Sequence, residues 1–282
     1  MNTTMRTMRV GFDRGVTELR HTFRSAQDLW GYLFPAVLFL TIMLFMRNAT
    51  VPGTAFSLGT RTLPSMLGMG IAIGGLVNLA QQLLVEREDG TLLRAKATPN
   101  GMRGYLVGKI VLVSGMLLIG LVLQLVPGLF LLDGLSLSVG SWLTLAWVIV
   151  VGLVATLPLG AIVGSLFENP RNFGLVMLPV MGLIATSGIF YPINTFPTWL
   201  QWLGQAFPIY WLGLGMRSAM LPDELSAVEI GQSWRHLETL TVLGVWALAG
   251  LVLAPIILRR MARRESGSRV EQRRQRAMQR IN

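Results

Sequence analysis

Cysteine is absent from this chain of 282 residues, and histidine occurs only at His21 and His236. The lack of cysteine excludes a disulfide-stabilised domain, and two distant histidines without an H-E-x-x-H motif argue against a zinc site. Charged residues make up only 13% of the chain, against about 25% in soluble domains, while apolar residues make up 52%. So few charges cannot cover the surface of a soluble domain of this size. The composition therefore excludes an ordinary soluble enzyme and predicts an integral membrane protein.

Six apolar runs are long enough to cross a bilayer, which takes about 20 helical residues. They are residues 29–46, 63–84, 105–132, 142–167, 173–193 and 240–258. Because a lone span must satisfy its own backbone hydrogen bonds in lipid, each is expected to be a helix. We therefore expect an all-α integral membrane protein, with six transmembrane helices in a domain over residues 29–258. Prolines inside the later runs predict kinks, at Pro127, Pro158, Pro179 and Pro255.

Basic residues are concentrated on one side of this arrangement. With both termini in the cytoplasm, 20 of the 24 Lys and Arg residues lie in inner segments. Only Arg47, Arg61, Arg217 and Arg235 lie outside. This bias predicts cytoplasmic N- and C-termini. The basic tail, residues 259–282, is expected to contact anionic lipid headgroups rather than nucleic acid, because its place beside the membrane explains its charge without a nucleic-acid motif.

Residues 1–28, together with Trp30 just beyond them, contain apolar side chains at spacings of three and four. The stripe comprises Met5, Met8, Phe12, Val16, Leu19, Phe23, Ala26 and Trp30. It predicts an amphipathic helix in the cytoplasmic interface, which either only anchors the chain to lipid or also contacts a cytoplasmic partner. Gly11 and Gly15 are expected to weaken this helix.

Glycines four residues apart predict close helix packing in three places. The pairs are Gly70 with Gly74, Gly104 with Gly108, and Gly160 with Gly164. The segment from Gly104 to Lys109 lacks the four-residue gap and the Ser or Thr of a phosphate-binding loop. We expect it to be the start of a helix.

Polar residues are scarce inside the apolar runs, and no acidic residue lies in the middle of one. This argues against a proton-coupled pump and against a channel with a carboxylate ring. Asn78, Gln81 and Gln82 lie on one helical face of the second run. They either line a possible translocation path or cross-link helices near the interface.

The loop after the second run is too polar to enter the membrane. Residues 86–89 (Glu-Arg-Glu-Asp) end the run, Gly90 breaks the helix, and residues 91–97 predict two helical turns that stop before Pro99. Further motifs follow at residues 97–99 (Ala-Thr-Pro) and at Gly108-Lys109. Downstream, residues 187–192 read SGIFYP and residues 196–200 read FPTWL, before Phe207-Pro208 and Arg217.

In this order and spacing, these motifs resemble the type 2 ABC-exporter permeases. These proteins are the membrane subunits of drug-resistance (daunorubicin-type) and of polysaccharide or polyketide exporters. The resemblance implies that this chain is no enzyme and binds no cofactor itself. ATP and Mg²⁺ would be bound by a separate cytoplasmic ABC ATPase subunit. Two permeases, as a homodimer or heterodimer, would work with two ATPases in the bacterial cell membrane.

The resemblance also implies where the subunits meet. Residues 86–98 would be the coupling helix in a groove of the ATPase, and the N-terminal helix would be a second contact. The ATPase-coupling residues would be Glu86, Arg87, Glu88, Gly90, Thr91, Leu92 and Arg94.

On the outer side, the resemblance implies two short re-entrant helices over residues 194–221. They would form an outer gate with Phe190, Tyr191, Pro192, Pro197, Trp199 and Pro208. An aromatic belt at the membrane interface is the alternative explanation of Trp199, Trp202, Tyr210 and Trp211. Residues 221–238, with Asp223, Glu224 and Glu229, are expected to form a solvated outer loop.

The function expected from these features is ATP-driven export of an amphiphilic compound, a drug or lipid-like metabolite, with multidrug efflux and antibiotic resistance as its context. A lipid-linked glycan exporter of the same family is one alternative. An ion-coupled secondary transporter is another, although we find neither the inverted repeat nor the midplane ionisable residues that it predicts. A membrane scaffold without transport activity is a third.

Overall fold

The computed structural model describes residues 3–49, 57–98, 100–135, 137–167 and 173–264. These residues form helices, turns and bends, with no strand among them. The longer helices are α1 (Thr3–Thr22), α2 (Ala26–Met46), α3 (Leu58–Ile73), α4 (Leu79–Glu88), α6 (Gly101–Leu131), α7 (Val139–Leu166), α8 (Gly174–Thr186), α10 (Pro208–Met220) and α11 (His236–Arg264). The shorter ones are α5 (Thr91–Lys96) and α9 (Thr198–Ala206), and a π-helical turn, η1 (Gly74–Asn78), joins α3 to α4.

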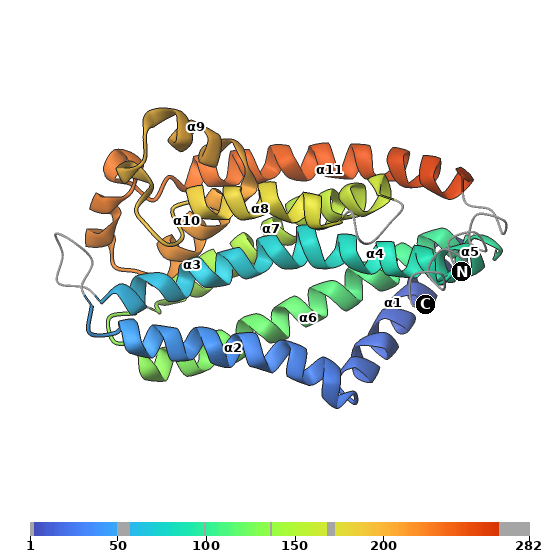
Figure 1. The fold of residues 1–282 in the computed structure, drawn as a ribbon, viewed down its shortest axis with the longest axis horizontal. Coiled ribbons are helices and arrows are strands. Elements are labelled where there is room, and N and C mark those ends of the chain that lie inside the picture. The colour runs from blue at the N-terminus through green and yellow to red at the C-terminus, as the bar shows by residue number, and fades with distance from the viewer. Residues whose placement is uncertain (1–2, 50–56, 99, 136, 168–172, 265–282) are drawn as a thin grey trace, which may run out of the picture.

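The bundle is elongated, and its two ends differ. The start of α1, the short helix α5 and the end of α11 lie together at one end, which we call the α5 end (Figure 1). Helices α9 and α10 lie toward the opposite end, which we call the α9 end. Short 3-10 helices precede and follow this pair in the chain: η3 (Ile193–Thr195), η4 (Asp223–Val228) and η5 (Ile230–Gln232).

Four helical segments in the described part of the chain are long and apolar enough to cross a membrane. They are Leu58–Glu88, Gly101–Leu131, Val139–Leu166 and His236–Arg263. Each contains one of the predicted apolar runs or nearly all of it. The runs 29–46 and 173–193 correspond to shorter apolar helices, Leu33–Met46 and Met177–Thr186. All-helical membrane architecture is therefore confirmed, while six crossings remain a prediction.

Several predicted boundaries are wrong. The N-terminal helix ends at Thr22 and α2 starts at Ala26, so Trp30 belongs to α2. The run 173–193 stops being helical at Thr186, and Gly188 adopts a φ of 71°, a left-handed conformation that ends helices. At the other end of the chain, α11 includes residues 259–264 of the predicted tail. Residues 265–282 lie outside the described part of the chain.

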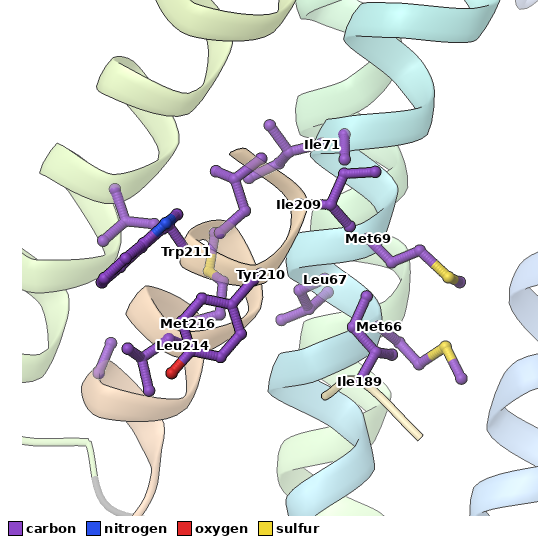
Figure 2. Close-up of a cluster of buried hydrophobic side chains, with 14 of the residues drawn as sticks. Met66, Leu67, Met69, Ile71, Ile189, Ile209, Tyr210, Trp211, Leu214 and Met216 are labelled. Carbon is purple, nitrogen blue, oxygen red and sulfur yellow. The ribbon is translucent and has the colours of Figure 1, made fainter. Parts of the chain in front are cut away.

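Helix α10 lies at the centre of the larger hydrophobic core. It packs against α3, α7 and α11, and Figure 2 shows its side chains with those of α3 around them. Tyr210 and Trp211 are buried there, whereas Trp199 and Trp202 on α9 are 66% and 72% exposed. The aromatic-belt interpretation is therefore wrong for Tyr210 and Trp211, which are core residues.

Helix α7 packs against η1 and α4 so closely that only glycine fits at two of its contact positions. A Cβ atom on Gly160 would overlap the carbonyl oxygen of Gly75, and one on Gly164 would lie 2.7 Å from that of Ala80. The packing role predicted for the Gly160 pair is thus confirmed. In the Gly70 pair only Gly74 packs closely, since a Cβ atom there would overlap the Leu117 side chain of α6, whereas one on Gly70 would meet nothing within 4 Å in the described chain.

Candidate functional site

A partly buried ionic cluster joins three helices at the α5 end. We call it the Lys109 cluster; it comprises Glu18 of α1, Glu86 of α4, and Tyr105 and Lys109 of α6. The Tyr105 hydroxyl donates a hydrogen bond to a Glu86 oxygen at 2.5 Å. The Lys109 Nζ atom lies 2.6 Å from the Glu18 Oε2 atom and also pairs with Glu86. Two carboxylates thus hold one buried ammonium group, which couples the position of α4 to α1 and α6.

Glu18 is held in its charged form. Partial burial raises the pKa of this carboxyl, but hydrogen bonds and charges from Lys109 and Arg14 outweigh it, so the pKa is lowered overall. Arg14 lies one turn earlier, with its Nε atom 2.8 Å from Glu18 and its guanidinium 5.5 Å from the Tyr105 ring centre. Glu18 therefore stays a carboxylate at neutral pH.

Glycines bring α1 and α6 together just beside this cluster. A Cβ atom on Gly11 would lie 2.5 Å from the carbonyl oxygen of Gly104, and one on Gly15 would lie 2.5 Å from that of Gly108. Beyond the expected weakening of the isolated helix, Gly11 and Gly15 form the contact face of α1 with α6. The first part of the predicted apolar stripe, Met5, Met8 and Phe12, is exposed, whereas Leu19 lies against Gly115 of α6.

The predicted coupling segment divides into two helices. Glu86, Arg87 and Glu88 form the last turn of α4, Gly90 has a φ of 80°, and only Thr91–Lys96 forms the separate helix α5. The helix break at Gly90 is thus confirmed, and a single helix over residues 86–98 is wrong. The Thr91 N–H donates to the Asp89 carboxylate at 2.8 Å, which satisfies one backbone donor at the start of α5.

One face of α5 is fixed to the bundle and the other is exposed. Leu92 and Ala95 are buried among α4 and α6 residues. Arg94 is exposed, and its guanidinium donates to the Thr91 hydroxyl at 2.9 Å. A short helix of this kind can transmit movement, because its exposed face is free for a partner while its apolar face follows α4 and α6.

Arg87 and Glu88 face different surroundings. Arg87 is buried and donates to the carbonyl oxygen of Phe167 at 2.8 Å, which ties α4 to the end of α7. Glu88 is partly exposed, and its carboxylate makes no ion pair or hydrogen bond with any residue that the structure describes. The seven residues predicted to couple to the ATPase therefore lie at one end, but Arg87, Gly90 and Leu92 are internal.

The predicted path residues lie along η1 and α4. Asn78 is partly buried at the end of the π turn, and Gln81 is exposed. The Oε1 atom of Gln82 is buried without a hydrogen-bond partner in the described chain. None of the three lines the cavity of about 770 Å³ between α6 and α11 at the α5 end.

The residues predicted to form an outer gate gather at the α9 end. Phe190, Tyr191, Pro197 and Trp199 are exposed, and Pro192 is partly buried. Pro208 is buried as the first residue of α10, a position where its missing N–H removes no helical hydrogen bond. Two short helices, α9 and α10, are present within residues 194–221.

A second ionic cluster, which the sequence did not predict, is buried at the α9 end. We call it the Glu229 cluster; it comprises Arg61 and Ser65 of α3, Arg217 of α10, and Glu229. Arg217 binds both Glu229 oxygens, at 2.9 and 3.1 Å, and donates to the Ser65 hydroxyl at 3.1 Å. Arg61 adds one bond to Glu229 at 3.2 Å, and its Nε atom has no partner in the described chain.

The loop that supplies Glu229 is therefore not simply solvated. Glu229 and Leu225 are buried, and the Asp223 carboxylate accepts a hydrogen bond from the Trp234 indole at 3.0 Å. Burial raises the pKa of the Glu229 carboxyl, but the charges of Arg217 and Arg61 outweigh burial and lower it overall. A signal was present for Arg217, which carries part of the family resemblance, but none marked Glu229.

Comparison with known proteins settles the family. A family model described as ABC-2 family transporter protein matches residues 52–256. The chain belongs to the ABC-2 transporter family. The match runs from before α3 into α11 and so includes the α4–α5–α6 junction and the whole Glu229 cluster, whereas Glu18 lies outside it. No curated protein matches the chain. An ABC-2 permease is the membrane transport subunit of an exporter. This ABC-2 protein is therefore a membrane permease.

Proposed function

We propose that this ABC-2 permease works as a dimer with a cytoplasmic ABC ATPase that binds its α5 end. The ATPase would hold ATP and Mg²⁺, and this chain would move an amphiphilic compound, a drug or lipid-like metabolite, outward. A polysaccharide or lipid-linked glycan is the second candidate cargo within this family, and an ion-coupled mechanism is the competing one.

The observation that carries this proposal is the construction of the α5 end. Helix α5 exposes Arg94 while it packs Leu92 and Ala95 into the bundle. The adjacent Lys109 cluster ties α4 to α1 and α6 through Glu86. An ATPase can shift the permease only by favouring one arrangement of such contacts over another. A partner that moves α5 would therefore also move two long apolar helices.

The arrangement of the ends supports the proposed topology. The start of α1, α5 and the end of α11 share one end of the bundle (Figure 1). That is the end at which the sequence concentrates its basic residues, as expected for a cytoplasmic side. With α2 and α8 as the two further crossings, the chain would cross the bacterial cell membrane six times.

Cargo movement is assigned to the apolar helices and to the α9 end. The four long spans are apolar, and the exposed residues Phe190, Tyr191 and Trp199 would form the outer gate of the dimer. Asn78, Gln81 and Gln82 remain our candidates for polar contacts along the path. An apolar path with few charges fits an amphiphile better than an ion.

Substitutions at two glutamates in the last turn of α4 test the coupling proposal. Glu88→Ala removes a carboxylate without an intramolecular partner in the described chain, so we expect normal yield but at least a several-fold loss of permease-stimulated ATPase activity. The comparison variant is Glu86→Gln, which weakens the bonds to Tyr105 and Lys109. It should lower thermal stability as well as activity, because it leaves buried polar groups poorly satisfied.

The measurement uses the permease reconstituted in vesicles with a candidate partner ABC ATPase. ATP-dependent uptake of fluorescent amphiphiles and ATP hydrolysis are followed together. If Glu88→Ala lowers yield and activity equally, the residue is structural and the docking site is misplaced. Uptake driven by an ion gradient without ATPase would support the secondary-transporter alternative instead.

A further inference from the structure

The cavity between α6 and α11 has polar and apolar ends. We call it the α6–α11 cavity. Its volume is about 770 Å³, and its lining on α11 extends from Leu251 to Arg263. At 1.5 Å per helical residue, these residues cover about 18 Å, more than half of the hydrocarbon thickness of a bilayer. The cavity is thus long enough to hold a chain rather than only a small polar group.

Positive charge gathers at the end of the cavity nearest to α5. Arg103 of α6 and Arg259 and Arg263 of α11 line it there, together with Lys96 of α5. No ion pair within the described chain involves Arg103, Arg259 or Arg263. Lys109 also lines the cavity, but its charge is matched by Glu18 and Glu86. No Asp or Glu belongs to the described lining, so the cavity offers three arginines without counter-ions.

The rest of the cavity wall is apolar and partly open. Leu79 and Leu83 of α4 and Leu157 of α7 line its interior. At its margins, Ile110 of α6 and Leu251 of α11 are 46% and 52% exposed. In a membrane-embedded helix bundle, exposed apolar side chains face lipid. The opening between α6 and α11 would therefore admit a lipid chain from the side.

We propose that the α6–α11 cavity binds an anionic phospholipid from the leaflet at the α5 end. Its phosphate would lie among Arg103, Arg259 and Arg263, and one acyl chain would run toward Leu157 and Leu251. Charge complementarity selects this ligand, because guanidinium groups bind phosphate oxygens bidentately while a wall of leucine side chains accepts hydrocarbon. The site does not depend on the proposed ATPase or on transport, and so goes beyond the proposed function.

Lipid binding by the purified permease tests this inference. Native mass spectrometry in detergent would compare dioleoyl-phosphatidylglycerol with dioleoyl-phosphatidylcholine. We expect retention of phosphatidylglycerol, and about fivefold weaker binding after Arg259→Gln, which corresponds to about 1 kcal/mol per basic residue at an anionic surface. Arg260→Gln is the matched control, since Arg260 is also exposed and is adjacent in α11 but does not line the cavity.

A second pair of variants tests the apolar end without changing charge. Leu251→Trp would narrow the opening and should weaken phosphatidylglycerol binding, whereas Val252→Trp, at an exposed residue outside the lining, should not. Glycerol 3-phosphate, the headgroup without chains, should fail to compete. Competition by glycerol 3-phosphate would show a free-phosphate site instead and overturn the lipid assignment.

Three further results would overturn the assignment. They are equal retention of the two phospholipids, equal effects of Arg259→Gln and Arg260→Gln, and equal effects of Leu251→Trp and Val252→Trp. All are read from the permease alone, so they differ from a failure of ATPase coupling, which is read from ATP hydrolysis.

Discussion

Replacing Glu229 with glutamine is expected to destabilise the permease by about 3–5 kcal/mol, the cost of breaking a buried ion pair from one side. Glu229 is the one carboxylate that Arg61 and Arg217 contact in the described chain. Its neutralisation would leave two buried guanidinium groups without a counter-charge. Thermal unfolding in detergent, followed by size-exclusion chromatography, would measure the loss. Glu224→Gln, at an exposed residue of the same loop, is the control and should change little.

The two arginines should not be equivalent. Arg217 makes two bonds to Glu229 and one to Ser65, whereas Arg61 makes a single bond to Glu229 and leaves its Nε atom unpaired in the described chain. Arg217→Met should therefore lower the free energy of unfolding more than Arg61→Met does. The second variant still leaves Arg217 paired with Glu229, so the remaining pair has no net charge. Equal losses for all three variants, or no loss for Glu229→Gln, would contradict this account of the Glu229 cluster.

Acid should weaken this cluster only well below neutral pH. Because the pKa of Glu229 is lower in the folded protein than in the unfolded chain, its contribution is complete above the unfolded pKa. The contribution is lost as the pH falls through the folded pKa. The stability difference between the wild type and Glu229→Gln should therefore be constant around pH 7 and shrink in acid.

Gly160→Ala is expected to be strongly disruptive although it adds only a single methyl group. The new Cβ atom would overlap the backbone carbonyl of Gly75, so α7 and η1 must move apart. Overpacking usually costs about 1–3 kcal/mol, and a clash with backbone belongs at the upper end. Yield of monodisperse protein and its melting temperature would report the loss.

Gly244→Ala provides the control for this change. Gly244 lies inside α11, and a Cβ atom there would meet no described residue within 4 Å. Alanine should be tolerated or should stabilise the helix by up to about 1 kcal/mol. If Gly160→Ala behaves in the same way as Gly244→Ala, the close contact of α7 with η1 does not exist.

The membrane helices could be predicted from the sequence because composition and charge placement are properties of short segments. An apolar run of about 20 residues can cross lipid only as a helix unless it joins a closed barrel. Gly90 breaks the helix through its own backbone freedom, which does not depend on distant residues. The glycines of α1 show the limit of local reasoning. Taken alone, Gly11 and Gly15 weaken a helix, but opposite the glycines of α6 they allow backbone contact.

The Glu229 cluster could not be predicted for a related reason. Glu229 stands in a polar loop beside Asp223 and Glu224, and nothing local distinguishes the buried carboxylate from the exposed one at Glu224. Its burial depends on Arg61, 168 residues earlier in the chain, and on Arg217 of a helix that folds into the core. Partners this distant become visible only in three dimensions.

The central claim is that the α5 end faces the cytoplasm, where an ATPase can reach it. The chain contains no cysteine, so single cysteines introduced at exposed positions can be labelled without further changes. Arg94→Cys marks the α5 end and Ala227→Cys marks the loop at the α9 end. In intact cells, a membrane-impermeant maleimide should label Ala227→Cys but not Arg94→Cys. Arg94→Cys should become labelled only after the membrane is permeabilised. Labelling of Arg94→Cys from outside would contradict the account.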